Sequence, residues 1–343
     1  MLTGRGRYVS DWNLPGQAHA HFVRSDRAHA AIVSIDKQAA LASPGVLAVF
    51  TGEDLKELKS LPAALPVKGR GGAELINPGR PALAQGRVRF AGDAVAIVVA
   101  ETAAAAQDAA ELMAIEYRDL PAVIAATDAV APGAALVHDS VPGNVVLDFE
   151  SGDQQKTRLA FENAARVVQL TVDNSRVVGN PMEPRACLAA YLPSEAMYHL
   201  YTCTQGAPIM RNQLSAVLGV PPEKIRVIAE EVGGGFGVRF NLYPEYCAAL
   251  FAATRGAWRA RGGVPVLAAA ECPSGIVDRV KASADARIAI VAAKAGSAGD
   301  ADETAAIVAA MKRRITVLAV FAVAASGLLS ACGSEGVSSA VRS

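Results

Sequence analysis

A run of four glycines in five positions, at residues 233–237, is the feature that most constrains how this chain can fold. Glycine adopts positive φ without steric cost, so such a run lets backbone N–H groups approach a ligand closely. The run follows an expected strand at 224–229 and precedes an expected helix at 244–254, an order that can present amides to an anionic oxygen. It is neither a P-loop nor a GxGxxG motif. A flexible turn explains the same spacing, so both interpretations stay open.

Composition narrows the class of protein. Lys and Arg total 33 and Asp and Glu total 33, so the net charge of zero argues against a nucleic-acid-binding protein. An apolar content of 52% with no net charge also argues against long disorder. The five cysteines lie far apart with no CxxC, which argues against a disulfide framework, a zinc finger or an iron–sulfur ligand run. A reducing, cytoplasmic location fits this usage, and no secretory signal is expected at the N-terminus.

Hydrophobic patterning predicts mixed α and β structure in the first 253 residues. A helix is expected from Glu53, capped by Thr51, and another over the Ala-rich residues 102–115. A third helix is expected over 208–218, with Gly219 as its C-cap. A turn-rich stretch at about 125–148 predicts a domain boundary. Strands are expected at 17–24, 30–35, 46–50, 95–100, from 116, and at 165–174, 187–192, 197–201 and 224–229.

The last ninety residues differ in character. Residues 254–310 are Ala-rich and remain unassigned, apart from a possible strand at 287–294. Residues 311–343 begin with Lys-Arg-Arg, then carry a short apolar run and a Leu-Ser-Ala-Cys box, which resembles a bacterial lipoprotein signal in an internal position. The apolar run is shorter than the roughly 20 residues of a spanning helix. We therefore hypothesise a truncated or frame-shifted gene product. The alternatives are a buried or disordered helix and membrane association through 311–332.

Gln205 is a second candidate functional residue. It ends the sequence Thr202-Cys203-Thr204-Gln205, directly after an expected strand. A side-chain amide at a strand end can donate a hydrogen bond to an oxo group or a bound heterocycle. Taken alone, a polar residue at this place is more often a surface or capping group.

The order strand, TxTQ, helix, strand, GGGFG resembles the molybdenum-binding large subunit of the xanthine dehydrogenase/aldehyde oxidase family, including its carbon monoxide dehydrogenase-like branch. Further motifs extend the resemblance over about residues 2–253. These motifs are Leu2 to Val9 (LTGRGRYV), Phe22 to Ser25 (FVRS), Ala28 to Ala30 (AHA), Pro44 to Val46 (PGV), Thr51 to Leu55 (TGEDL), Val88 to Asp93 (VRFAGD), Ala109 to Leu112 (AAEL), Glu116 to Pro121 (EYRDLP), Asn180 to Arg185 (NPMEPR) and Tyr243 to Glu245 (YPE).

The resemblance implies an α+β fold. Residues 1–125 would form an a/b hammerhead domain, and residues 145–253 the first part of an incomplete molybdopterin-binding domain. It also implies site residues. Gln205 would contact an oxygen on molybdenum, Phe236 would lie beside the substrate channel, and Gly234, Gly235 and Gly237 would bring amides to the cofactor. No side chain is expected to ligate the metal.

The resemblance further implies the chemistry. Such enzymes hydroxylate an aldehyde or heterocycle with water-derived oxygen, or oxidise CO, at a molybdenum–molybdopterin centre, here expected in its cytosine dinucleotide form. FAD and 2Fe–2S groups would sit on a medium and a small partner subunit, because this chain has no such regions. Purine-oxidising relatives carry a glutamate three residues after the glycine loop. Phe240 stands there instead, which favours the aldehyde-type or carbon monoxide dehydrogenase-like branch.

The family chain is more than twice as long, and the part absent here would supply most pterin contacts and a general-base glutamate. Turnover by this chain alone is therefore not expected. Two other functions are considered: a non-catalytic scaffold that holds partner subunits, and a membrane-tethered pseudo-enzyme. Structural roles are expected for the remaining polar and thiol candidates, His29, Arg24, Glu183, Glu245, Cys203 and Cys247.

Overall fold

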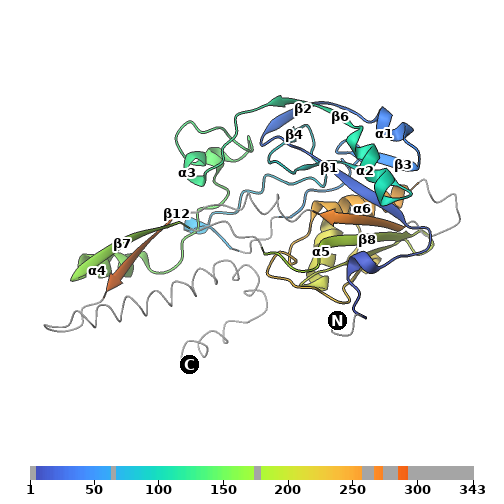
Figure 1. Cartoon of the computed structure of the whole chain (residues 1–343). Coiled ribbons are helices and arrows are strands. Elements are labelled where there is room, and N and C mark those ends of the chain that lie inside the picture. Colours follow the sequence, from blue (N-terminus) through green and yellow to red (C-terminus); the bar gives the residue numbers. More distant parts are fainter. Residues whose placement is uncertain (1–4, 63–66, 174–178, 257–265, 273–284, 293–343) are drawn as a thin grey trace. The chain divides into compact units, whose positions relative to one another are not determined.

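The computed structural model describes residues 5–62, 67–173, 179–256, 266–272 and 285–292 (Figure 1). These residues fall in two compact units. The first lies within 1–64, 74–147 and 175–284, and the second within 65–73, 148–174 and 285–343. The signal-like segment 311–343 and most of the Ala-rich stretch 254–310 lie outside the described residues. Within the described residues, no helix is long and apolar enough to cross a lipid bilayer.

A seven-stranded sheet forms the centre of the first unit. Its strands are β1 (Ala18–Arg24), β3 (Val46–Thr51), β5 (Ala94–Ala100), β8 (Arg185–Leu192), β9 (Met197–Thr202), β10 (Ile225–Ile228) and β11 (Val266–Cys272). Their order across the sheet is β10-β9-β8-β11-β1-β5-β3. The β1–β11 and β9–β10 pairs are parallel and the others antiparallel. Strands from both expected domains therefore share one sheet.

Side-chain alternation along the strands assigns each face of this sheet to different helices. In β5, Ile97 and Val99 belong to the main core, whereas Val98 between them packs on the opposite face. The main core also contains the buried sides of α5 (Ala207–Leu218) and α6 (Pro244–Arg255). Helices α1 (Gln38–Ala42) and α2 (Ala103–Glu111) pack on the opposite face at the β5 end. Because β5 is covered on both faces, it is apolar throughout.

A smaller sheet in the first unit has the order β4-β2-β6, with β2 at Ala30–Asp36, β4 at Arg87–Val88 and β6 at Ala114–Asp119. Both pairs are antiparallel. Ala30 and Val88 form a core with Val95 of β5, so the two sheets share apolar packing. The described residues also contain four short 3-10 turns, at Val9–Asp11, Pro142–Asn144 and Pro222–Lys224 in the first unit and at Arg70–Gly72 in the second.

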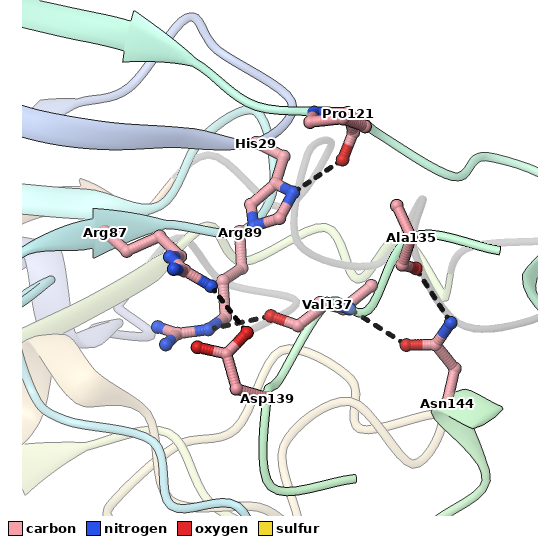
Figure 2. Close-up of polar contacts among 8 residues, drawn as sticks. All are labelled: His29, Arg87, Arg89, Pro121, Ala135, Val137, Asp139 and Asn144. Atoms are coloured by element: carbon pink, nitrogen blue, oxygen red, sulfur yellow. Dashed lines mark hydrogen bonds and ion pairs between the residues drawn. The ribbon is translucent and has the colours of Figure 1, made fainter. Parts of the chain in front are cut away.

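Between β6 and residue 147 the regular structure is one short helix, α3 (Ala126–Ala129), and the 3-10 turn at Pro142–Asn144, and polar contacts fix the path of this segment. Asn144 donates from Nδ2 to the carbonyl oxygens of Ala129 (2.8 Å) and Ala135 (3.0 Å). Its Oδ1 accepts the N–H of Val137 at 2.9 Å (Figure 2). Because one side chain satisfies three backbone groups, this segment is ordered without a sheet or a long helix.

Two arginines attach the same segment to the smaller sheet. Arg89 donates from Nε to the carbonyl oxygen of Val137 at 3.3 Å. Arg87, in β4, pairs with Asp139 at 3.2 Å (Figure 2). Burial lowers the pKa of Arg89, and the neighbouring charge of Arg87 lowers it further.

The second unit is small. It contains α4 (Gln154–Glu162) and an antiparallel pair, β7 (Arg166–Asp173) with β12 (Asp285–Ala292). Asp153 caps α4 by accepting the N–H of Lys156 at 2.9 Å. The Arg70 guanidinium pairs with Asp148 at 3.0 Å and with Glu150 at 2.8 Å. These ion pairs are exposed, so they stabilise the unit only weakly.

The strands expected from the sequence are confirmed to within about three residues at their ends. Two helix predictions need correction. After Thr51 the chain forms turns instead of a helix, and the Asp54 carboxylate accepts the Thr51 N–H and hydroxyl within them at 2.7 and 3.1 Å. Helix α2 begins after its cap Thr102 but ends at Glu111, since Ile115 pairs with Ile35 in the smaller sheet. Tertiary pairing there overrides the helical propensity of the Ala-rich run.

Candidate functional site

The glycine loop, residues 233–237, connects β10 to α6. Gly234, Phe236 and Gly237 have φ values of +110°, +50° and +81°. A positive φ is uncommon for phenylalanine, so the surrounding contacts hold this residue in a strained conformation. Helix α6 begins at Pro244, seven residues after the loop. The order of strand, loop and helix expected from the sequence is therefore present, although the loop itself is not the N-terminus of α6.

Glu183 holds the beginning of this loop. Its Oε2 accepts the N–H of Gly233 at 2.8 Å, and its Oε1 accepts the N–H of Val9 at 3.2 Å. The residue is 1% exposed. A Cβ atom on Gly233 would lie 2.5 Å from Glu183 Cβ and 2.8 Å from the Tyr8 ring, closer than real Cβ contacts allow. Only glycine fits between these two side chains.

Arg239 holds the other end of the loop. Its guanidinium is buried and donates to Cys203 Sγ at 2.6 Å and to the carbonyl oxygen of Glu183. The Thr204 hydroxyl donates to the Arg239 carbonyl oxygen at 3.2 Å. Burial raises the pKa of the Cys203 thiol, and it also raises that of Cys247. Both cysteines are free and buried, which agrees with structural roles.

Gln205 is bonded to the backbone of the same arginine. Its N–H donates to the Arg239 carbonyl oxygen at 3.1 Å, and its Oε1 accepts the Arg239 N–H at 3.3 Å. A backbone N–H can only donate, so this bond fixes which end of the side-chain amide faces Arg239. The Gln205 Nε2 has no hydrogen bond to any described residue. A Cβ atom on Gly235 would lie 2.7 Å from Gln205 Cδ, so the loop and this side chain touch.

The exposed side of the loop carries donors and one large ring. The N–H groups of Gly234, Gly235, Phe236 and Gly237 donate to no acceptor among the described residues. The Phe236 side chain is 72% exposed. Together with Gln205 Nε2, these groups make a surface that can donate hydrogen bonds to an anionic or oxo oxygen beside an aromatic ring.

The structure brings together all the predicted site residues, Gln205, Gly234, Gly235, Phe236 and Gly237. No sequence pattern assigns a role to Arg239, and Glu183 is expected from the sequence to be a structural group only. The one signal for Arg239 is its place two residues after the last loop glycine. Its contact with Glu183 joins residues 56 positions apart in the sequence, so no local pattern could have revealed it.

The described residues do not enclose a cofactor-sized pocket here. A cavity of about 30 Å³ is lined in part by Glu183, Arg185, Val238 and Arg239. That volume suits about one water molecule and no more. The glycine loop and Gln205 are therefore presented on a surface and not in an enclosed pocket. Nor do the described residues contain any group of three or more His, Cys, Asp or Glu side chains that could hold a metal ion.

Other polar candidates have structural partners. His29 Nδ1 lies 2.7 Å from the Pro121 carbonyl oxygen (Figure 2). Arg24 forms a part-buried ion pair with Glu245 at 2.8 Å. Burial raises the pKa of Asp93, at the start of β5, to about 6.

Two family models match most of this chain. The model for the aldehyde oxidase and xanthine dehydrogenase a/b hammerhead domain matches residues 3–121, and the model for the molybdopterin cofactor-binding domain matches residues 137–261. The chain belongs to the xanthine dehydrogenase/aldehyde oxidase family of molybdopterin-binding large subunits. The α+β fold and the family resemblance expected from the sequence are confirmed. Members of this family are molybdopterin-dependent oxidoreductases.

Individual relatives cover most of this chain but little of their own length. The carbon monoxide dehydrogenase large chain of Hydrogenophaga pseudoflava is 34% identical over 264 residues, covering 74% of this chain and 32% of the relative. The nicotine 6-hydroxylase large subunit of Paenarthrobacter nicotinovorans is 37% identical over 248 residues, covering 71% and 29%. The chain thus spans about a third of the length of these family members.

A solved structure supports the same assignment. Quinoline 2-oxidoreductase from Pseudomonas putida 86 superimposes with a TM-score of 0.67 and 36% identity. The match covers 78% of this chain and 32% of that chain.

Proposed function

We propose that this chain forms one wall of the molybdopterin site in a molybdenum hydroxylase large subunit. The observation that carries the proposal is the donor surface of the glycine loop. Gln205 Nε2 and the four N–H groups of residues 234–237 have no acceptor among the described residues, and they lie on one loop and the side chain that touches it. An anionic cofactor with oxygen ligands fits such a set of donors.

In this proposal, each group has a separate task. Gln205 donates from Nε2 to an oxygen of the cofactor, since its Oε1 is already bonded to the Arg239 N–H. The loop amides of Gly234, Gly235 and Gly237 donate to further cofactor oxygens. The exposed Phe236 ring lines the approach of an apolar substrate. When bound, the molybdopterin group would supply the redox centre that oxidises the substrate with water-derived oxygen.

For the substrate, we propose an aldehyde, a heterocycle or CO. Phe240, which lies three residues after the loop, offers no carboxylate for a purine. The names of the similar proteins include a carbon monoxide dehydrogenase, a nicotine 6-hydroxylase and a quinoline 2-oxidoreductase, which supports this range.

We further propose the cytosine dinucleotide form of the cofactor and two partner subunits, one with 2Fe–2S groups and one with FAD. Relatives named as large chains or as a subunit of a dehydrogenase complex support an assembly of several chains. Cys187, Cys203 and Cys247 are free thiols in the structure, which fits a reducing, cytoplasmic location. Because the chain spans about a third of its relatives, we propose that it has no activity alone.

The test is elemental analysis of the chain purified from its own host with any bound partners. We expect about one molybdenum per chain, as for a single cofactor site. Gln205→Leu removes the side-chain donor and is expected to lower oxidation of aldehydes, heterocycles or CO. Gln107→Leu, at an exposed glutamine on α2, is the matched control and should match the wild type. Absence of molybdenum from the wild-type assembly would contradict the proposal and favour a non-catalytic scaffold.

A further inference from the structure

Glu183 lies beneath the glycine loop with an unusual set of partners. Its buried carboxylate accepts one N–H from each of two distant segments, Val9 near the N-terminus and Gly233 at the beginning of the loop. It forms no ion pair with a described residue, although it is 1% exposed. Ionised carboxylates accept stronger hydrogen bonds than neutral groups do, so both contacts fix the backbone firmly.

Arg239 links Glu183 to Gln205, whose side chain carries the Nε2 donor. Its backbone carbonyl accepts a bond from the Arg239 guanidinium, and the Arg239 backbone bonds Gln205 in both directions. The loop is therefore held at Gly233 by the carboxylate and at Arg239 through the carbonyl of the same residue. Since a Cβ on Gly235 would lie 2.7 Å from Gln205 Cδ, a shift of the loop must also move Gln205.

We infer that Glu183 is a positioning residue, which sets the glycine loop against Gln205 and so aims the donors of both. This inference rests on the proposed function for its consequence in the cofactor site. The contacts themselves belong to this chain and can be tested without the cofactor. A carboxylate can be buried with both oxygens bonded to one segment. In Glu183, each oxygen instead accepts an N–H from a different segment.

The first experiment measures amide hydrogen exchange in the full chain, without cofactor. Glu183→Gln keeps the shape of the side chain but turns an NH2 group toward one of the two N–H donors. We expect exchange in peptides covering residues 229–242 to increase about tenfold, the effect of losing one hydrogen bond. Peptides from β5 should exchange as in the wild type.

Glu245→Gln is the matched control, because Glu245 is also buried, at 3% exposure, and is bonded to Arg24. We expect it to leave exchange in residues 229–242 within about twofold of the wild type. If Glu183→Gln folds and leaves loop exchange unchanged, or if Glu245→Gln raises it equally, the inference is wrong.

Glu183→Asp covers the case in which Glu183→Gln does not fold. Aspartate keeps the charge and both oxygens but is one methylene shorter, so it can keep only one of the two N–H contacts at its present length. Raised exchange in residues 229–242 would support the inference, and unchanged exchange would overturn it.

The second measurement is a spectroscopic signature in the assembled, molybdenum-containing enzyme. We expect the electron paramagnetic resonance spectrum of the partly reduced molybdenum centre to differ from the wild type in Glu183→Gln and not in Glu245→Gln. An unchanged spectrum in a loaded Glu183→Gln assembly would overturn the positioning role. A wild type that never contains molybdenum would instead contradict the proposed function, while the exchange result would still stand or fall on its own.

Discussion

Strand β5 and the glycine loop are both central to the first unit, yet different forces hold them. All seven residues of β5 are buried, and their apolar side chains pack on both faces of the sheet. The loop contains four glycines and one exposed ring, so it buries almost no side chain of its own. Polar contacts hold the loop in place. They come from Glu183, which is 50 residues away in the sequence, and from Arg239, which follows the loop. The strand is held by its own residues, and the loop by its neighbours.

This difference predicts how each region responds to substitution. A change in β5 acts through lost apolar burial, and its cost spreads over the whole fold. A change at the loop acts through the fit between backbone and buried polar groups, so its cost is smaller while its effect on local geometry is larger. Variants in the two regions therefore separate when global stability and loop exchange are measured together.

Ile97→Ala is expected to have the largest effect on stability. Ile97 is fully buried, and its register partners are Phe22 in β1 and Phe50 in β3. Removing its side chain leaves a cavity, so we expect the free energy of unfolding to fall by about 3.5 kcal/mol. Urea denaturation measures this. Ile124→Ala, at a position 71% exposed, should change the same free energy by less than about 0.5 kcal/mol. Equal losses of unfolding free energy in the two variants would show that apolar burial is not what holds β5.

Gly233→Ala is expected to cost less, about 2 kcal/mol, because the added Cβ meets Glu183 Cβ and the Tyr8 ring at 2.5 and 2.8 Å. Hydrogen exchange at the loop should rise more than in Ile97→Ala. The control is Gly206→Ala, whose Cβ would meet only ordinary contacts at 3.4 Å or more. A Gly233→Ala chain as stable as the wild type would show that the loop is not confined as described.

The same two regions show how far the sequence alone leads. The apolar runs of β5 and β8 and the glycine C-cap of α5 follow from local patterns, and the structure confirms them. The loop residues and Gln205 were identified through motif order. What holds them was not, because Glu183 reaches the loop across 50 residues of sequence. The order of strands in the seven-stranded sheet likewise depends on pairing between distant segments, and the domain boundary at about 125–148 stays a prediction.

The polar end of β5 gives a test that depends on pH. Burial raises the pKa of Asp93 to about 6, although the Arg89 N–H and the charge of Arg80 oppose that shift. The folded state therefore holds the proton more tightly than the unfolded state, so this group's contribution to stability is lost as pH rises through about 6. Asp93→Asn cannot titrate. Relative to this variant, we expect the wild type to lose about 2 kcal/mol between about pH 4 and pH 7, after allowance for partial exposure.

Urea denaturation of both chains at several pH values measures the Asp93 effect. Other titrating groups contribute to both chains, so the difference between the two isolates Asp93. A difference that stays constant from about pH 4 to pH 7 would show that Asp93 titrates normally and that the end of β5 is more hydrated than its burial indicates.

Thr102→Ala is expected to have the smallest effect and gives the strictest test of locality. Thr102 caps α2 by accepting the Ala105 N–H at 3.1 Å, and α2 packs on the far side of β5 from the main core. Losing the cap should lower the free energy of unfolding by about 1 kcal/mol, whereas Thr102→Ser, which keeps the hydroxyl, should lose much less. Because α2 shares no described hydrogen bond with residues 229–242, loop exchange should match the wild type in both variants. Faster loop exchange in Thr102→Ala would mean that the apolar core and the loop respond as one element, and the distinction between them would fail.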